Sequence, residues 1–488
     1  MNPHPGAAAP GAAQPRTVPR WTWYFLPRPA ESGGNHIELL RGGAELFAAM
    51  ATAIALARRE IWLATYIFHT DAASLALVAA LCEAARRGVA VHVVVDGFGS
   101  LHSVELLRRL FEPAGVRLAV FRPLTRLAHW FQPGQLRRQH MKLCSVDGRT
   151  GFVGGINIID DHVDLRHGLS EAPRLDYAAR VRGRAGLAIL QAARAVWMRA
   201  ALGPQWRREV TRLLQLAAGA TLRLPVPAEA TTTTAATTPP PQPHLRPHLR
   251  PRRRRLSWLR RQVRLLQGVL GGGRPGRRRG VAGATGAAGQ SLRPVQASFV
   301  VRDNLRQRRS IERAYVDALR GARRRILIVC PYFYPGGEFR RALCDAARRD
   351  VVVHLLLQGK LDYRLAGLAA RALYDELLRA GVRIHEYTPA FLHAKVAVVD
   401  DCWATVGSSN IDPLSLLINL EANLVVRDAA FCARLTGEIE RDLALARRVD
   451  EPEARRQGWR GWAGLATRAL VAWVAHVYLR VAGVTGRY

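Results

Sequence analysis

The chain has 488 residues, of which 49% are hydrophobic and 23% are charged. This composition is that of an ordinary globular protein and argues against wholesale disorder and against a collagen-like or fibrous structure. The 72 basic residues outnumber the 38 acidic ones and give a net charge of +34, which indicates a partner dense in negative charge: nucleic acid, an anionic membrane surface or a phosphorylated substrate.

The first 20 residues are rich in Ala, Pro and Gly and have no periodic pattern, so we expect a disordered arm and no secretory signal there. The six cysteines include no C-x-x-C pair. They therefore indicate neither a zinc cluster nor a disulfide framework, and they favour a reducing compartment. No uncharged stretch reaches the ~18 residues that a membrane-spanning helix needs. These features predict a protein that is soluble or attached to a membrane surface.

Two long segments of the chain repeat one another. Residues 81–87 (LCEAARR) match residues 343–349 (LCDAARR), and each is followed by a fully apolar run around residues 91–95 or 353–357. A helix with a basic end followed by a buried strand is typical of α/β units. The offset of 262 residues is too long for a solenoid repeat, so the sequence predicts a duplicated α/β domain.

A segment of different composition separates the two copies. Between Thr231 and Gln290 it contains 13 Arg and no acidic residue, together with Thr, Pro and Gly tracts. Such a composition is typical of a linker. We therefore predict a first domain at residues 21–215, a basic linker at 216–295, a second domain at 296–445 and a tail at 446–488.

Two apolar and basic segments outside the predicted domains are candidates for contact with an anionic membrane. Between Trp462 and Val481, the few charged or titratable residues fall on one narrow stripe of a helix, as in a helix that lies in the membrane surface. Residues 256–270 of the linker mix Leu, Val and Trp with Arg. The alternatives are a tail helix docked on the protein's own core and a solvated basic tether in the linker.

The clearest chemical signal involves lysine. The chain has 3 Lys against 69 Arg, and two of the three lie two positions after a histidine. A strand places residues of this spacing on one face. An ammonium group beside an imidazole suits phosphate chemistry, because Lys holds phosphoryl oxygens and His acts as nucleophile or acid near neutral pH. An exposed strand edge is the alternative for one copy, but both copies continue with Asp and Asn at identical spacing: His140, Lys142, Asp147 and Asn157; His393, Lys395, Asp400 and Asn410.

With these motifs the sequence resembles the phospholipase D superfamily, whose members carry two H-x-K-x4-D motifs, each followed by a Gly/Ser-rich turn and an Asn. More narrowly, it is similar to bacterial cardiolipin synthases of the shorter type without N-terminal transmembrane helices, through residues Asp96–Ser100, Pro331–Gly336 and Trp403–Ser415. The resemblance implies two tandem phospholipase D-like α/β domains, each a mixed sheet flanked by helices, related by pseudo-twofold symmetry. Both His-x-Lys pairs would face one phosphate, with no metal or other cofactor.

The resemblance also implies roles for individual residues. His140 is the expected nucleophile that forms a phosphohistidine, and His393 is the expected acid and base, although the symmetry of the motifs leaves the reverse order open. Asp147 and Asp400 complete the two catalytic motifs, and we expect them to stabilise the turn after the motif strand. The residues expected to bind the phosphate oxygens are Lys142, Lys395, Asn157, Asn410 and, as a weaker candidate, Ser409.

A histidine nucleophile needs an acceptor on its second ring nitrogen, which fixes the tautomer. Members of the resembled family use a carboxylate downstream on an adjacent strand. Asp176 lies 36 residues after His140, and Glu421 lies 28 residues after His393. We assign both carboxylates this orienting role; the alternative is a carboxylate that caps a strand or pairs with a nearby Arg.

Together these features predict a peripheral enzyme on the cytoplasmic face of the bacterial cell membrane. It would transfer a phosphatidyl group from one phosphatidylglycerol to another, forming cardiolipin and glycerol, with phosphatidylethanolamine as an alternative lipid partner. Aromatic residues that follow apolar strands would either line a cleft for acyl chains or belong to the core: Tyr66, Phe68, Tyr332, Phe333 and Tyr334.

Three other functions are compatible with parts of the sequence. A hydrolytic phospholipase D would use the same residues with water as the acceptor. A nuclease of the same superfamily would explain the net charge, but much of that charge lies in the linker and the apolar tail has no use on DNA, so nucleic acid is not the expected partner. A catalytically silent membrane scaffold is disfavoured by two intact motifs. The oligomeric state stays open.

Overall fold

The computed structural model describes residues 25–123, 137–165, 168–206, 208, 211–212, 294–304, 306–360 and 373–450. The predicted N-terminal arm, nearly all of the linker and the tail from residue 451 lie outside the described residues. The predicted domain boundaries and the two membrane-contact segments therefore stay predictions. Within the described part of the chain, no helix is both long and apolar enough to cross a bilayer.

The first half of the described chain alternates strands and helices. Its elements are β1 (Glu31–Arg41), α1 (Gly42–Ala55), β2 (Glu60–Thr65), α2 (Ala72–Arg86), β3 (Ala90–Asp96), α3 (Val104–Phe111), β4 (Arg117–Phe121), β5 (Lys142–Val146), β6 (Thr150–Gly154), β7 (Val163–Asp164), β8 (Gly168–Leu169), β9 (Tyr177–Arg182) and α4 (Arg184–Leu202).

The second half repeats this alternation. Its elements are β10 (Val295–Arg302), α7 (Ser310–Gly321), β11 (Arg325–Cys330), α8 (Gly337–Arg348), β12 (Val352–Gln358), α10 (Tyr374–Arg379), β13 (Arg383–Tyr387), β14 (Val396–Val399), β15 (Trp403–Gly407), α11 (Pro413–Leu417), β16 (Glu421–Arg427), α12 (Ala429–Ala444) and β17 (Arg447–Arg448).

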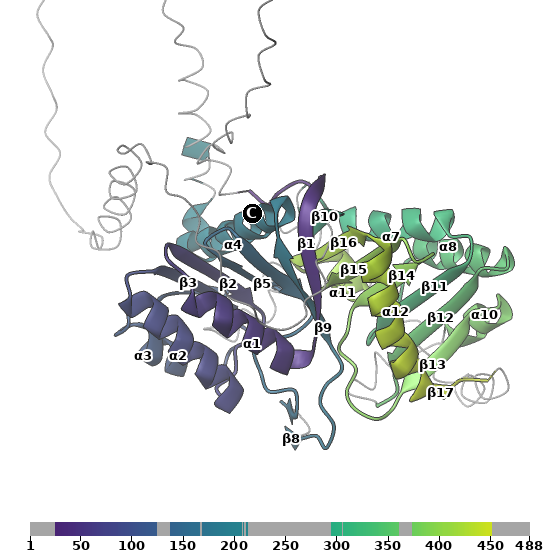
Figure 1. Ribbon diagram of the computed structural model, residues 1–488, viewed down its shortest axis with the longest axis horizontal. Helices are drawn as coiled ribbons and strands as arrows, with labels where there is room; N and C mark the ends of the chain where they lie inside the picture. Colours follow the sequence, from purple (N-terminus) through teal and green to yellow (C-terminus); the bar gives the residue numbers. More distant parts are fainter. Residues whose placement is uncertain are drawn as a thin grey trace, which may run out of the picture. The chain divides into compact units, whose positions relative to one another are not determined.

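Fifteen strands form one sheet that runs through both halves (Figure 1), in the order β17-β13-β12-β11-β14-β15-β16-β10-β1-β9-β6-β5-β2-β3-β4. Outwards from the central β10–β1 pair, the two halves have the same strand order, and the second half adds β17 at its outer edge. β10 and β1 pair antiparallel, as a twofold axis between the halves requires. The sheet is mixed, because β2, β3 and β4 run parallel while β2 and β5 run antiparallel. The predicted tandem α/β domains are confirmed.

The inner strands are buried on both faces, which explains their continuous apolar runs. In β2, Ile61 and Leu63 pack with α1 and α2, whereas Trp62 and Ala64 pack with α4. Helices α4 and α12 belong to one hydrophobic core that includes residues of both halves. The two halves are therefore joined by a shared core as well as by the sheet.

The register of the strands brings several loops to one edge of the sheet. The carboxyl end of β2 lies beside the amino end of β5, where Ala64 pairs with Leu143, and Lys142 of β5 pairs with Gly154 at the end of β6. In the second half, Val329 of β11 pairs with Val396 of β14 in the same way. The segments before β5 and β14, which carry the two histidine motifs, therefore lie at the edge where β2 and β11 end.

Candidate active site

Each histidine is hydrogen-bonded to a buried carboxylate of the opposite half. Nδ1 of His140 lies 2.9 Å from Oε1 of Glu421, the first residue of β16. Nδ1 of His393 lies 2.6 Å from Oδ2 of Asp176, which directly precedes β9. The prediction that follows from sequence separation, with each carboxylate serving the histidine upstream in its own half, is therefore wrong: the pairing crosses between the halves.

Backbone contacts explain this exchange. The amide of His140 donates to the carbonyl of Leu420 at 3.0 Å, and the amide of His393 donates to the carbonyl of Leu175 at 2.8 Å. Each histidine segment thus pairs briefly with the chain just before the carboxylate of the other half. Distance along the sequence could not reveal this pairing, because the carboxylate that follows each histidine motif in the chain belongs to the same half as that motif.

The two lysines of the motifs are buried beside the histidines. Their side chains are 6% exposed for Lys142 and 1% exposed for Lys395, and each ammonium group donates to the carbonyl oxygen of the histidine two residues before it. Burial lowers the pKa of Lys142 to about 7 and the pKa of Lys395 to about 8. The charge of Lys395 also lowers the pKa of Lys142, so the ammonium groups of both halves share one site. A phosphate there would favour their charged forms.

The two histidine–carboxylate pairs differ in their protonation. Burial lowers the pKa of His140, and burial together with the charges of both motif lysines lowers the pKa of His393 well below its usual value. Burial also raises the pKa of Asp176, to about 7. For Glu421, burial is outweighed by His140, Lys142 and a serine hydroxyl, which lower its pKa below the usual value. These directions favour an anionic Glu421 beside a neutral His140 imidazole, and they favour protonation of the His393–Asp176 pair more than of the His140–Glu421 pair.

The serine that distinguishes the pairs is Ser408. Its hydroxyl donates to Oε2 of Glu421 at 2.5 Å and accepts from the amide of Ala422 at 3.0 Å. Gly155 holds the corresponding position of the first motif, and a Cβ atom there would lie 2.2 Å from Oδ1 of Asp176. The first half therefore has no room for a hydroxyl at this place.

Sequence analysis named the neighbouring Ser409 and missed Ser408. The hydroxyl of Ser409 donates to the carbonyl of Asn410 at 3.1 Å, and its amide donates to Asn423 at 3.3 Å, so Ser409 mainly supports the turn. The difference between Gly155 and Ser408 at equivalent positions of the two repeats is the sequence signal that points to Ser408.

The two asparagines lie in the turns that follow β6 and β15. Asn157 is 6% exposed and Asn410 is 7% exposed. Oδ1 of Asn157 accepts from the amide of Ile67 at 3.2 Å, whereas Oδ1 of Asn410 is buried without a hydrogen-bond partner among the described residues. Their predicted role in binding phosphate oxygens stays a prediction.

Asp147 and Asp400 lie at the other end of the motif strands, directly after β5 and β14. Both have positive φ angles, 53° and 50°. Burial raises the pKa of each carboxyl group, but hydrogen bonds from backbone amides outweigh it and lower the pKa below the usual value. These carboxylates hold the start of the neighbouring strands β2 and β11 by accepting from the amides of Arg58, Arg59 and Glu60, and of Arg323, Arg324 and Arg325.

Aromatic residues near the site have two different roles. The ring of Tyr66 meets the ring of His140 edge to face at 4.8 Å, and the ammonium group of Lys142 lies 5.4 Å from the Tyr66 ring centroid. Phe68 and Phe333 are 0% and 1% exposed and belong to the hydrophobic cores. The interpretation of these two phenylalanines as the lining of an acyl-chain cleft is therefore wrong.

The loop after β3 supports the segment that leads to His140. Asp96 is fully buried and accepts from the amides of Phe98 at 2.8 Å and Gln139 at 2.9 Å. Arg138 lies 3.5 Å from the same carboxylate. Within the described ranges, no group of three or more His, Cys, Asp or Glu side chains is placed to hold a metal ion.

Comparisons with known proteins agree with this geometry. Residues 50–169 and 315–443 match the family described as "Cardiolipin synthase, PLD-like domain". Cardiolipin synthase B of Salmonella typhi is 34% identical over 427 residues, which are 87% of this chain and 85% of that protein. Cardiolipin synthase B of Escherichia coli K12 is 32% identical over 429 residues with the same coverage.

Among solved structures, phosphatidylserine synthase of Haemophilus influenzae is similar with a TM-score of 0.53 and 14% identity, covering 89% of this chain and 94% of that chain. At this identity the likeness concerns the fold. The family match covers a segment of each half and so agrees with the repeat seen in the sheet. Since relatives at 32–34% identity also span most of its length, the chain belongs to the cardiolipin synthase family of phospholipase D-like proteins.

Proposed function

We propose that the chain is a cardiolipin synthase, which transfers a phosphatidyl group from one phosphatidylglycerol to a hydroxyl of a second and releases glycerol. The observation that carries this proposal is that two histidines, one from each half, are hydrogen-bonded to buried carboxylates of the other half and accompanied by two buried lysines. The names of the relatives, cardiolipin synthase B, support the choice of lipid substrate. The enzyme would act as a peripheral protein at the cytoplasmic face of the cell membrane.

In the first step, Nε2 of His140 attacks the phosphorus of the donor lipid. Glu421 accepts the Nδ1 proton of His140 in a hydrogen bond, which leaves the lone pair of Nε2 free to form the P–N bond. The P–O bond to glycerol breaks, and His393 gives its proton to the departing oxygen. The products are free glycerol and a phosphatidyl group on His140.

In the second step, a hydroxyl of another phosphatidylglycerol takes the place of glycerol. His393 removes its proton, the oxygen attacks phosphorus, and the P–N bond breaks, which returns His140 to its neutral form and releases cardiolipin. Lys142 and Lys395, with Asn157 and Asn410, would hold the non-bridging oxygens while phosphorus is five-coordinate. With water in place of the second lipid, the same steps would produce phosphatidic acid.

The difference between the two pairs supports His140 as the nucleophile. A nucleophile must be a neutral imidazole, which the lowered pKa of His140 favours, and the lowered pKa of Glu421 keeps that side chain a carboxylate that accepts the Nδ1 proton in a hydrogen bond. An acid must deliver a proton, and the raised pKa of Asp176 provides one more proton at the His393 pair. The reverse order is the competing assignment.

The test is an analysis of lipid products from the purified full-length chain. Vesicles of phosphatidylglycerol, with and without phosphatidylethanolamine, should give cardiolipin and an equal amount of glycerol by mass spectrometry. His140→Ala and His393→Ala should give neither product, whereas His36→Ala, which changes an exposed histidine of β1, should behave like the wild type. Phosphatidic acid as the main product would contradict a synthase, and cleavage of single-stranded DNA with unchanged lipid would contradict lipid chemistry altogether.

A further inference from the structure

The two halves differ in the segment between the asparagine that follows each motif and the carboxylate that pairs with a histidine. This connection takes 19 residues from Asn157 to Asp176 and 11 residues from Asn410 to Glu421. In the first half it contains the β7–β8 hairpin, which forms a separate two-stranded sheet. In the second half it contains the short helix α11 instead. The hairpin is therefore an addition to the repeated scaffold.

Hydrogen bonds hold the base of this hairpin. The amide of Ser170 donates to the carbonyl of His162 at 2.7 Å, and Nδ1 of His162 lies 3.0 Å from the carbonyl oxygen of Ser170. Arg174 donates from its guanidinium to the carbonyl of Val163 and from its amide to the carbonyl of Asp161. These contacts close the base of the hairpin, and the carboxylate of Asp161, which accepts from the amide of Gly43, joins that base to α1.

Above this fixed base, the hairpin presents two leucines to solvent. Leu169 is 84% exposed and Leu165 is 55% exposed. Leu169 is the most exposed large hydrophobic side chain among the described residues. Figure 1 shows β8 projecting away from the large sheet, so the protein's own core leaves these side chains uncovered.

The hairpin lies next to the reacting groups. Six residues after Leu169, the carbonyl of Leu175 accepts from the amide of His393 at 2.8 Å, and Asp176 is the partner of the His393 ring. The hairpin follows β6 at its carboxyl end, where Gly154 pairs with Lys142. It therefore leaves the same edge of the sheet as the two histidine motifs.

Apolar side chains are also exposed in the loop after β3. Phe98 and Leu101, in the loop after β3, are 42% and 43% exposed. This loop is joined to the segment before His140 through Asp96 and the amide of Gln139. The loop with Phe98 and Leu101 is thus connected to the His140 segment, as the hairpin is connected through Leu175 to the His393 segment.

We propose that the β7–β8 hairpin is a membrane anchor, in which Leu165 and Leu169 enter a phospholipid bilayer beside the active site and seat the histidines against the headgroups. This inference rests on the proposed function, because a lipid substrate has its phosphate in the headgroup layer. The two leucines would bind by leaving water, and an attraction of that kind resists salt.

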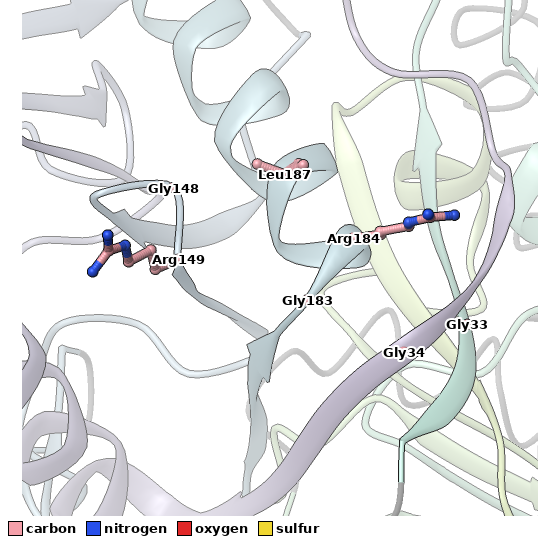
Figure 2. Close-up of a pocket in the computed structure, with 7 residues that line it drawn as sticks. All are labelled: Gly33, Gly34, Gly148, Arg149, Gly183, Arg184 and Leu187. Carbon is pink, nitrogen blue, oxygen red and sulfur yellow. The ribbon is translucent and has the colours of Figure 1, made fainter. Parts of the chain in front are cut away.

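The test compares two double variants of the full-length chain. Leu165→Ser/Leu169→Ser removes the apolar tip of the hairpin. Leu56→Ser/Leu187→Ser is the matched control, because these leucines are 74% and 55% exposed but lie near the turn after β5, at the other end of the motif strands. Figure 2 shows Leu187 in a surface hollow there with Gly148 and Gly183, and with Arg149 and Arg184 pointing apart.

Binding to phosphatidylglycerol vesicles is measured by flotation at low salt and at about 0.5 M salt. We expect the hairpin variant to bind about tenfold more weakly than the wild type at both salt concentrations, because two leucines no longer leave water. The control variant should bind like the wild type. Equal binding by the hairpin variant and the wild type would overturn the proposal, and so would an equal loss in both double variants.

Turnover separates an anchor from a part of the catalytic machinery. On a short-chain phosphatidylglycerol below its micelle concentration, the hairpin variant should keep wild-type turnover, while its turnover on vesicles falls about tenfold. An equal loss on both substrates would overturn the anchor role. If the wild type turned over neither lipid, the proposed function would fail, whereas the flotation result would still decide whether the hairpin binds membranes.

A fluorescent probe gives a third readout that does not depend on catalysis. Five cysteines are buried and Cys402 is exposed, so Cys402→Ser provides a background for single labelling. An environment-sensitive dye on Leu169→Cys should become brighter and shift to the blue with vesicles, and the same dye on Leu187→Cys should not. An unchanged spectrum at position 169 would contradict insertion of the hairpin.

Discussion

The two halves of the molecule share one strand order, yet they supply different chemistry to the site between them. Each half gives a histidine and a lysine, and each lends its carboxylate to the histidine of the other half. The second half adds the hydroxyl of Ser408 beside its carboxylate, while the first half has Gly155 at that place. Duplication therefore explains why there are two histidines, and the small differences support the proposed division into a nucleophile and an acid.

The largest effects are expected when one histidine at a time is removed and the donor lipid has a leaving group that needs no acid. This experiment tests which histidine is the nucleophile and which is the acid. With phosphatidyl-p-nitrophenol, His393→Ala should still release nitrophenol in a single burst and keep the phosphatidyl group on His140. His140→Ala should lose at least about a thousandfold in rate and form no adduct.

Both variants should be inactive on phosphatidylglycerol, because the natural leaving group needs the proton. Mass spectrometry of the intact chain detects the adduct, and peptide mapping locates it. An adduct on His393 in the His140→Ala variant would establish the reverse order of roles.

The exchanged carboxylates can be separated in the same way. Glu421→Gln should slow formation of the adduct with either donor by roughly a hundredfold or more, because His140 loses the acceptor that fixes its tautomer. Asp176→Asn should cause a similar loss with phosphatidylglycerol but a much smaller one with the nitrophenyl donor. Rapid-quench measurements of the first turnover give both rates. If each carboxylate affected the step assigned to the histidine of its own half, the exchange across the halves would have no functional meaning.

Removal of the Ser408 hydroxyl should have a smaller effect, which appears in the pH dependence of turnover. The pKa of Glu421 is lowered partly by the hydroxyl of Ser408, and the proposed attack needs Glu421 as an anion. Without the hydroxyl the folded-state pKa of Glu421 rises, so activity should be lost at a higher pH as the solution is made acidic. Ser408→Ala should therefore move the acid limb of the rate profile upwards and lower turnover about tenfold at neutral pH.

Ser409→Ala is the control for this shift. The hydroxyl of Ser409 donates to a backbone carbonyl, and the acid limb should stay in place in this variant whatever happens to substrate binding. An unchanged profile in Ser408→Ala, or the same shift in both variants, would remove Ser408 from the difference between the halves.

The sequence predicts the repeated scaffold well, for reasons visible in particular residues. The apolar run around Val91 and its copy around Val353 lie in strands buried on both faces. The identical spacing from His to Lys to Asp in the two motifs reflects a strand that starts at the site and ends in the turn at Asp147 or Asp400. Local periodicity and spacing are enough for such features, because they depend on contacts within one half.

The sequence does not predict the parts of the site that depend on contacts between the two halves. Glu421 meets His140 because β1 and β10 pair at the centre of the sheet and bring distant segments together, and no local pattern records that contact. Ser408 was missed for a related reason: its partner is a carboxylate 13 residues away on another strand. The proposed membrane contact of Leu169 likewise rests on its exposure in the folded chain.

The smallest effects are expected at the turns after the two motif strands, where the halves are alike. Asp147 and Asp400 each accept three backbone amides, and their pKa values are lowered in the same direction. Asp147→Asn and Asp400→Asn should each cost about 1–2 kcal/mol in the free energy of unfolding, measured with urea. The folded enzyme should keep near wild-type turnover, because these groups lie at the far end of the motif strands.

The pH dependence of that cost follows from the lowered pKa. A carboxyl group with a lowered folded-state pKa stabilises the fold above its unfolded pKa, and this stabilisation disappears as the pH falls through the folded value. The difference between the wild type and either variant should therefore shrink in acid, and by the same amount for both. Unequal losses, or a large loss of turnover in one variant only, would show that the halves diverge even in the turns that support their motifs.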